Sequence, residues 1–222
     1  MRTVIFDLDG TLADTSADLI AAANACFQAR GEGTPLDPEV DAGTAFAGGR
    51  AMLRLGLSRL GREWSEADVD ADFPLLLKAY AEDIDRHTRL YPGAVEAVEA
   101  LRQRGDRVGI CTNKPEALAE TLLARLGVRG LFQSLIGADT LASRKPDPEP
   151  YRQSVLRAGG DVGRSLLVGD TVTDRNTARA AGVPVVLVTF GPEGPGIARL
   201  EPDALLGDYA DLPEMVERIL PM

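Results

Sequence analysis

Two aspartates, Asp7 and Asp9, stand one residue apart at the end of a short apolar run, in the stretch VIFDLDGTLADT. Side chains at positions i and i+2 share a face of an extended chain, so the two carboxylates point to the same side. Burying one carboxylate costs free energy, and burying two side by side costs more unless a cation or hydrogen-bond donors compensate them. The pair therefore raises the question of what compensates it.

Three further polar clusters stand where strand patterns end or where a helix pattern begins. They are Thr112 to Lys114, Ser143 to Pro148 and Gly169 to Asp174. In open α/β sheets, ligands bind beyond the carboxyl ends of the strands, so we expect these clusters to meet the first pair. Together they supply carboxylates, a hydroxyl and an ammonium, a set that suits a hard divalent cation and a phosphate group.

This combination predicts phosphoryl transfer with Mg²⁺ as the cofactor. With the metal in place, Asp7 can approach phosphorus as a nucleophile and form an aspartyl-phosphate. Asp9 can protonate the leaving alkoxide and later activate water. Thr112 offers a hydroxyl and backbone amides to the phosphoryl oxygens, and Lys145 supplies a positive charge where the transition state is negative.

The elements that must position these residues alternate along most of the chain, which is typical of a parallel sheet built from βαβ units. Strands are predicted at residues 3–6, 107–111, 134–136, 165–168 and 185–188. Helices are predicted at residues 93–103, 116–126, 149–158, 174–181 and 212–220. The expected fold is α/β: a three-layer, Rossmann-like core with a five-stranded parallel sheet.

Residues 16–88 break this alternation and read as helices alone, at 18–29, 50–60 and 66–86. We expect them to form a separate α-helical cap domain, with residues 1–15 and 89–222 forming the catalytic core. The two connections, near residues 14–16 and 87–93, are expected to act as a hinge pair.

The composition of the chain argues against nucleic-acid and membrane partners. The chain has 222 residues and a formal net charge of -10, which argues against a nucleic-acid partner because such binding needs Lys and Arg. No apolar run reaches the roughly 20 residues that span a bilayer, and no leader pattern is visible, so we expect a cytoplasmic protein that does not interact with membranes. Cys26 and Cys111 are far apart and are interpreted as reduced, buried residues.

The segments DLDGTLADT, ICTNKP, SRKPDPEPY and VGDTVTDRNTARAAG together resemble the four ordered motifs of the haloacid dehalogenase superfamily of phosphatases. The resemblance implies the roles given above for Asp7, Asp9 and Lys145, and it makes Thr112 a phosphate ligand. It also implies metal binding by Asp7, Asp170 and the main-chain carbonyl of Asp9. Asp174 would orient the residues of the site without itself binding the metal. The helical insert resembles the cap of the subfamily that contains phosphoglycolate phosphatases.

Simpler interpretations stand beside several of these. Thr112 and Asn113 can cap the following helix, and we expect Asn113 to help bind the phosphate as well, since a helix N-terminus binds anions. Asp174 suits a helix start on electrostatic grounds alone. The stretch Gly48-Gly49-Arg50 is either a simple turn into a helix or a clamp for a substrate carboxylate, and in the resembled subfamily this cap loop faces the active site and selects the substrate.

The leading hypothesis is a Mg²⁺-dependent phosphomonoesterase acting on a small phosphorylated metabolite, with 2-phosphoglycolate as the first choice and a sugar phosphate or nucleoside monophosphate as alternatives. A β-phosphoglucomutase-like phosphomutase would share the core and the cap type. A 2-haloacid dehalogenase needs no metal and lacks the second aspartate, so Asp9 speaks against it. A non-catalytic phosphate-binding protein would not need both a nucleophile and an acid/base. The protein is expected to be a monomer or a homodimer.

Overall fold

The computed structural model describes residues 1–221 and divides into two compact units. One unit comprises Met1–Ala13 and Leu90–Met222, and the other is the continuous segment Asp14–Arg89. The sequence-based boundaries, 16–88 for the inserted segment, differ from this division by one or two residues at each end. The short strands β2 (Ala13–Asp14) and β3 (Arg89–Leu90) lie where the chain leaves and re-enters the first unit, and they form a two-stranded sheet.

The first unit contains a parallel sheet in the order β5-β4-β1-β6-β7-β8. The strands are β1 (Thr3–Phe6), β4 (Arg107–Cys111), β5 (Ser134–Ile136), β6 (Ser165–Gly169), β7 (Val185–Val188) and β8 (Ala204–Leu206). The central strand β1 is buried throughout and pairs with β4 and β6, as its run of β-branched and aromatic residues favours. The expectation of an α/β, Rossmann-like core is therefore confirmed.

The number of strands predicted from the sequence, five, was wrong, because the structure has a sixth strand, β8. Its three residues follow Pro202 and Asp203, and they form the edge of the sheet, where only Leu206 is buried. So short a run with one buried side chain carries neither the continuous apolar signal nor the alternation by which a strand is recognised in a sequence.

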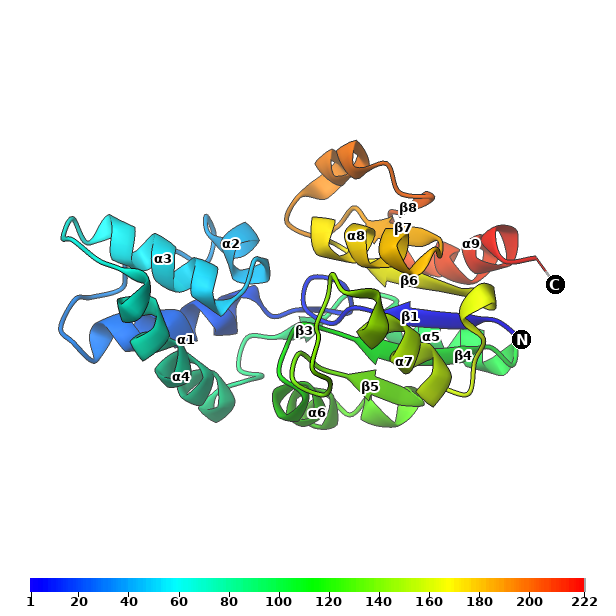
Figure 1. Cartoon of the computed structure of the whole chain (residues 1–222), viewed down its shortest axis with the longest axis horizontal. Coiled ribbons are helices and arrows are strands. Elements are labelled where there is room, and N and C mark those ends of the chain that lie inside the picture. The colour runs from blue at the N-terminus through cyan, green and yellow to red at the C-terminus, as the bar shows by residue number, and fades with distance from the viewer. Residues whose placement is uncertain (222) are drawn as a thin grey trace. The chain divides into compact units, whose positions relative to one another are not determined.

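Helices pack on both faces of this sheet (Figure 1). They are α5 (Ala94–Gln103), α6 (Glu116–Arg125), α7 (Pro148–Arg157), α8 (Val172–Ala181) and α9 (Leu212–Ile219). The connection from β4 through α6 to β5 moves toward one edge, and the connection from β5 through α7 to β6 moves back across β1, so right-handed crossovers place α6 and α7 on opposite faces. Because the strands are parallel, the loops after β1, β4 and β6 leave from the same edge of the sheet.

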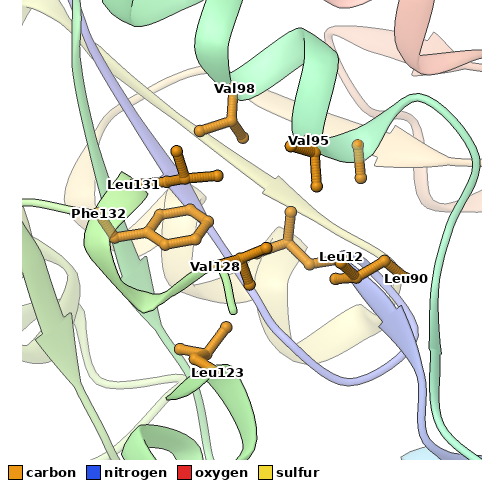
Figure 2. A pocket seen from close by; sticks show the side chains of 9 residues that line it. Leu12, Leu90, Val95, Val98, Leu123, Val128, Leu131 and Phe132 are labelled. Carbon is orange, nitrogen blue, oxygen red and sulfur yellow. The ribbon is translucent and has the colours of Figure 1, made fainter. Parts of the chain in front are cut away.

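A small apolar cavity of about 10 Å³ lies within this unit, as Figure 2 shows. Its lining is wholly hydrophobic and includes Leu12, Val98 and Phe132. A volume of this size is about that of a single water molecule, and a water needs polar partners, so we assign the cavity no binding role.

The second unit contains four helices, α1 (Ser16–Gln28), α2 (Ala42–Phe46), α3 (Gly49–Arg59) and α4 (Glu66–Glu82). Helix α1 packs against the other three. Gly56 lets α3 approach α1 closely, since a Cβ at this position would lie only 2.3 Å from the Phe27 ring. The short helix α2 was not predicted from the sequence. Among residues 1–221, no helix combines the length and apolar character that crossing a membrane would require.

Candidate active site

The first unit brings Asp7, Lys145 and Asp174 together beyond the carboxyl end of β1. The Lys145 ammonium lies 3.0 Å from Oδ1 of Asp7 and 2.6 Å from Oδ1 of Asp174. The Lys145 side chain is 1% exposed and that of Asp174 is fully buried, so this charge triad is shielded from solvent. Asp7 also accepts a hydrogen bond from the Leu8 backbone N–H, at 2.7 Å, which fixes the orientation of its carboxylate.

The surroundings of this triad raise the pKa of both Asp7 and Lys145, for different reasons. Burial raises the pKa of Asp7 to about 6, Lys145 acts to lower it, and the charges of Asp174 and Asp9 raise it further. The pKa of Lys145 is raised even though burial alone acts to lower it, because the carboxylates of Asp174 and Asp7 stabilise the ammonium. Lys145 is therefore held as a fixed cation beside Asp7.

Asp174 also organises the loop between β6 and α8. Its Oδ2 accepts hydrogen bonds from the hydroxyl and the backbone N–H of Thr171, at 2.7 and 3.1 Å, while Thr171 caps the helix. Both sides of a capping box are present, as the sequence pattern of a hydroxyl residue followed three positions later by an acid favours. A Cβ at Gly169 would lie 2.4 Å from Asp174, so glycine is needed there. Asp174 thus serves both the helix start and Lys145.

Asp170, which follows β6, has one oxygen without a partner. Its Oδ1 accepts a hydrogen bond from the Thr11 hydroxyl at 2.8 Å, whereas its buried Oδ2 has no hydrogen-bond partner in the structure. Burial and the charges of Asp174 and Asp7 raise the pKa of Asp170 well above its ordinary value. A buried carboxylate oxygen in this state costs free energy, which a cation beside it would recover.

These carboxylates are suited to hold a divalent metal ion. Asp7, Asp170 and Asp174 each offer a carboxylate oxygen, and these atoms lie within 4.8 Å of one another. An all-oxygen set of this kind suits Mg²⁺. Since both Asp174 oxygens already accept hydrogen bonds, the unpaired Oδ2 of Asp170 is the donor that best fits the ion, with Asp7 beside it.

A second ion pair links the first and second polar clusters. The Lys114 ammonium lies 2.9 Å from Oδ1 of Asp9, and their side chains are 3% and 18% exposed. Lys114 was counted in the sequence among the residues following the second strand, but no role was assigned to it. Its pairing depends on the conformation of two separate loops, which the sequence pattern does not specify.

The loop after β4 is held by its own side chains. Thr112 is buried, and its hydroxyl accepts a hydrogen bond from the Lys114 backbone N–H at 3.2 Å. Asn113 donates from its side-chain amide to the Lys145 carbonyl at 3.0 Å, which ties this loop to the one that carries the lysine. Neither side chain makes a capping hydrogen bond to α6, whose preceding residue is Pro115. Asn113 thus acts in the structure as a link between loops.

Two residues support the site without a role predicted from the sequence: Thr11, which belongs to the polar cluster after the first strand, and Tyr209, which was not predicted at all. Thr11 holds Asp170, and the Tyr209 hydroxyl donates to the Thr11 carbonyl at 2.7 Å. Tyr209 is fully buried and its ring packs against Phe190. Thr11 lies within the first motif and could have been chosen as a hydroxyl near the carboxylates, but nothing in the sequence connects it to Tyr209, which is 198 positions away.

The predicted cap residues belong to the second unit. Gly48 has a φ of 101°, a conformation that favours glycine, and precedes α3. A Cβ at Gly49 would lie 3.0 Å from the Phe73 ring. The Arg50 guanidinium stacks over that ring at 4.7 Å and donates to Asp70 at 2.5 Å, with 40% of its side chain exposed. The backbone conformation at Gly48 and the packing of Gly49 against Phe73 thus explain why glycines stand there. Arg50 contacts Phe73 and Asp70 within its own unit.

Comparison with known proteins places this architecture in a family. The profile of the family described as haloacid dehalogenase-like hydrolase matches residues 4–188. A phosphoglycolate phosphatase from Agrobacterium fabrum is 38% identical over 217 residues, covering 97% of this chain and 93% of the relative. Another from Rhodospirillum rubrum is 39% identical over 216 residues, covering 95% and 89%.

Solved structures show the same fold. A crystal structure from Haemophilus somnus 129pt, titled as a predicted phosphoglycolate phosphatase, superposes with a TM-score of 0.85 at 26% identity and covers 97% of each chain. The likeness extends over both units of the chain, so the inserted helical segment has counterparts in this relative.

Proposed function

Because the chain belongs to the haloacid dehalogenase-like hydrolases and is a phosphoric monoester hydrolase of that family, we propose that it hydrolyses 2-phosphoglycolate with Mg²⁺ as cofactor. One observation supports this chemistry most directly: the Asp7 carboxylate, oriented by the Leu8 N–H, lies 3.0 Å from the Lys145 ammonium and close to the carboxylate of Asp170, which has an unpartnered oxygen. The choice of substrate is supported by relatives that are named for this activity.

In the first half-reaction an Asp7 oxygen attacks phosphorus, and the bond from phosphorus to the leaving oxygen breaks as the aspartyl-phosphate forms. Asp9 gives a proton to that leaving oxygen, so glycolate departs as an alcohol. In the second half-reaction Asp9 takes a proton from water, which attacks the same phosphorus. Phosphate is released and the Asp7 carboxylate is regenerated.

Lys145 and the surrounding loops would stabilise the negative charge of the phosphoryl group. The fixed charge of Lys145 stabilises the negative charge that spreads over the phosphoryl oxygens, and Thr112 and Asn113 would bind the same group. Asp7, Asp170 and the main-chain carbonyl of Asp9 would hold Mg²⁺, which would supply a further positive charge to the phosphoryl group. Asp174 acts through Lys145, which it keeps charged and in place.

The test is a screen of the purified protein with Mg²⁺ against phosphorylated metabolites, with released phosphate as the readout. We expect 2-phosphoglycolate to give the highest kcat/KM and chelation of the metal to abolish turnover. Release of a phosphorylated isomer instead of phosphate would favour a phosphomutase, and a higher kcat/KM for sugar phosphates would overturn the substrate assignment. Asp7→Asn should abolish activity with the fold retained, and residual metal-dependent turnover would refute its role as nucleophile.

For the cap, we propose that Gly48, Gly49 and Arg50 contribute to substrate selection. Arg50→Ala should then raise KM for a carboxylated phosphate ester much more than for p-nitrophenyl phosphate. Asp70→Asn is the matched control, because it removes the internal partner of Arg50 and leaves the guanidinium in place. If Arg50→Ala changes KM for both esters equally, Arg50 serves only the packing of the cap.

A further inference from the structure

Lys114 is enclosed beside the proposed acid/base and has no role in the chemistry described so far. Only 3% of its side chain is exposed, and its ammonium lies 2.9 Å from Asp9. The backbone of Lys114 is fixed on both sides, because its N–H donates to Thr112 and its carbonyl accepts from the Ala138 N–H at 2.9 Å. A lysine so enclosed and so firmly anchored presents its charge at a defined place.

That place is next to the leaving group. A general acid must lie within hydrogen-bond reach of the oxygen it protonates, so Asp9 marks the position of the bridging oxygen of a bound ester. The cation that touches Asp9 therefore faces the first atoms of the leaving group. Lys145 contacts different carboxylates, those of Asp7 and Asp174.

We propose that Lys114 recognises a carboxylate separated from the bridging oxygen by one carbon, and so makes the core itself selective for phosphate esters of 2-hydroxy acids. This inference rests on the proposed phosphatase function and assigns its substrate class to a residue outside the cap. An ammonium has three rotatable N–H donors, so one lysine can contact Asp9 and a ligand carboxylate together. Charge-assisted hydrogen bonds of this kind are among the strongest in proteins.

The experiment compares three esters: 2-phosphoglycolate, 2-hydroxyethyl phosphate, in which a hydroxymethyl group replaces the carboxylate, and p-nitrophenyl phosphate, whose leaving group needs little protonation. The variants are Lys114→Met, Lys114→Arg and, as a control for lost positive charge, Arg157→Met at the exposed end of α7. Lys114→Met should lower the preference for 2-phosphoglycolate over 2-hydroxyethyl phosphate by about 10- to 100-fold. Lys114→Arg should recover much of that preference, and Arg157→Met should leave it unchanged.

An equal loss for 2-phosphoglycolate and 2-hydroxyethyl phosphate, with p-nitrophenyl phosphate spared, would overturn the proposal and make Lys114 only a positioning residue for Asp9. Binding can be measured without turnover in an Asp7→Asn background, by calorimetry with the same two alkyl esters. There, adding Lys114→Met should weaken only the carboxylated ester, and equal weakening of both would again overturn the proposal. Thermal unfolding of each variant verifies that it is folded.

Failure of the proposed substrate is recognised separately, from the unmodified protein. If it prefers a different 2-phosphooxy acid, such as phospholactate, the substrate assignment fails while the class assigned to Lys114 is supported, and the variants are then compared on that ester. If the unmodified protein shows no preference for carboxylated esters over esters without a carboxylate, Lys114 does not select a carboxylate and the inference is overturned.

Discussion

Replacing Asp7 with asparagine should stabilise the metal-free protein at neutral pH, although it should abolish turnover. The substitution keeps the size of the side chain and removes a charge that the fold holds at a cost. Burial raises the pKa of Asp7 from 3.8 to about 6, even with Lys145 beside it. With one pKa unit worth about 1.4 kcal/mol, a shift of this size amounts to about 3 kcal/mol.

The direction in which stability changes with pH follows from proton linkage. Between pH 3.8 and about 6 the folded state holds the Asp7 proton more tightly than the unfolded state, so the stability of the unmodified protein falls as the pH rises through this window. Below the window the aspartate is protonated in both states and asparagine resembles it closely. Above the window the full cost of ionising Asp7 is present, and the Asp7→Asn variant avoids it.

The assay is urea unfolding with a metal chelator, followed by circular dichroism at several pH values on either side of that window. The advantage of Asp7→Asn in the free energy of unfolding should grow from near zero at about pH 4 to about 3 kcal/mol above about pH 7. The control is Glu99→Gln, which removes the charge of an exposed acid on α5 outside the site. An advantage that stays constant with pH would refute the electrostatic reasoning. Saturating Mg²⁺ should reduce the advantage of Asp7→Asn, because the ion stabilises the protein that carries Asp7.

Three further substitutions probe the supports of the site and the cap. Gly10→Ala should abolish activity and lower stability, measured by phosphate release and urea unfolding, because Gly10 has a φ of 79° and the added Cβ would lie 2.2 Å from the Asp170 Oδ2. Thr171→Ala should cost about 1 kcal/mol of unfolding free energy by removing the cap of α8, and it should lower kcat more than it raises KM. Asp18→Ala should cost about 2 kcal/mol or more in urea unfolding followed by tryptophan fluorescence, since its buried carboxylate accepts hydrogen bonds from the backbone N–H and the hydroxyl of Thr88.

The central strands were predictable because their signal is local. The interior strands β1, β4 and β7 begin and end where the sequence predicts, since each contains a buried apolar run with β-branched residues that ends at a polar residue. The short elements β8 and α2 were not, because each has a single buried residue, Leu206 and Ala45, and so shows no apolar pattern by which it could be recognised. Helix α4 ends at Glu82, four residues before the predicted end, where Asp83 leaves the helical conformation with a φ of -133°.

The meeting of the polar clusters was also predictable, but their pairings were not. Asp7, Thr112 and Asp170 follow parallel strands, so topology alone brings them to one edge of the sheet. Lys145 follows no strand directly, so its role was inferred from its charge within a polar cluster and from the resemblance to a known family. Which carboxylate each lysine contacts depends on loop conformation and on side-chain rotamers, and these are set by long-range packing that a sequence pattern does not specify.

The charge balance of the assembled site argues that metal and substrate binding are coupled. Four carboxylates, those of Asp7, Asp9, Asp170 and Asp174, face the two ammonium groups of Lys114 and Lys145, and each ammonium already contacts a carboxylate. A phosphate ester brings further negative charge into a protein whose net charge is -10. Since like charges in a buried site repel strongly, a divalent cation bound beside Asp170, as proposed above, would allow the ester to approach Asp7. On this proposal, the affinities for the metal and for the ester both depend on the unpartnered oxygen of Asp170.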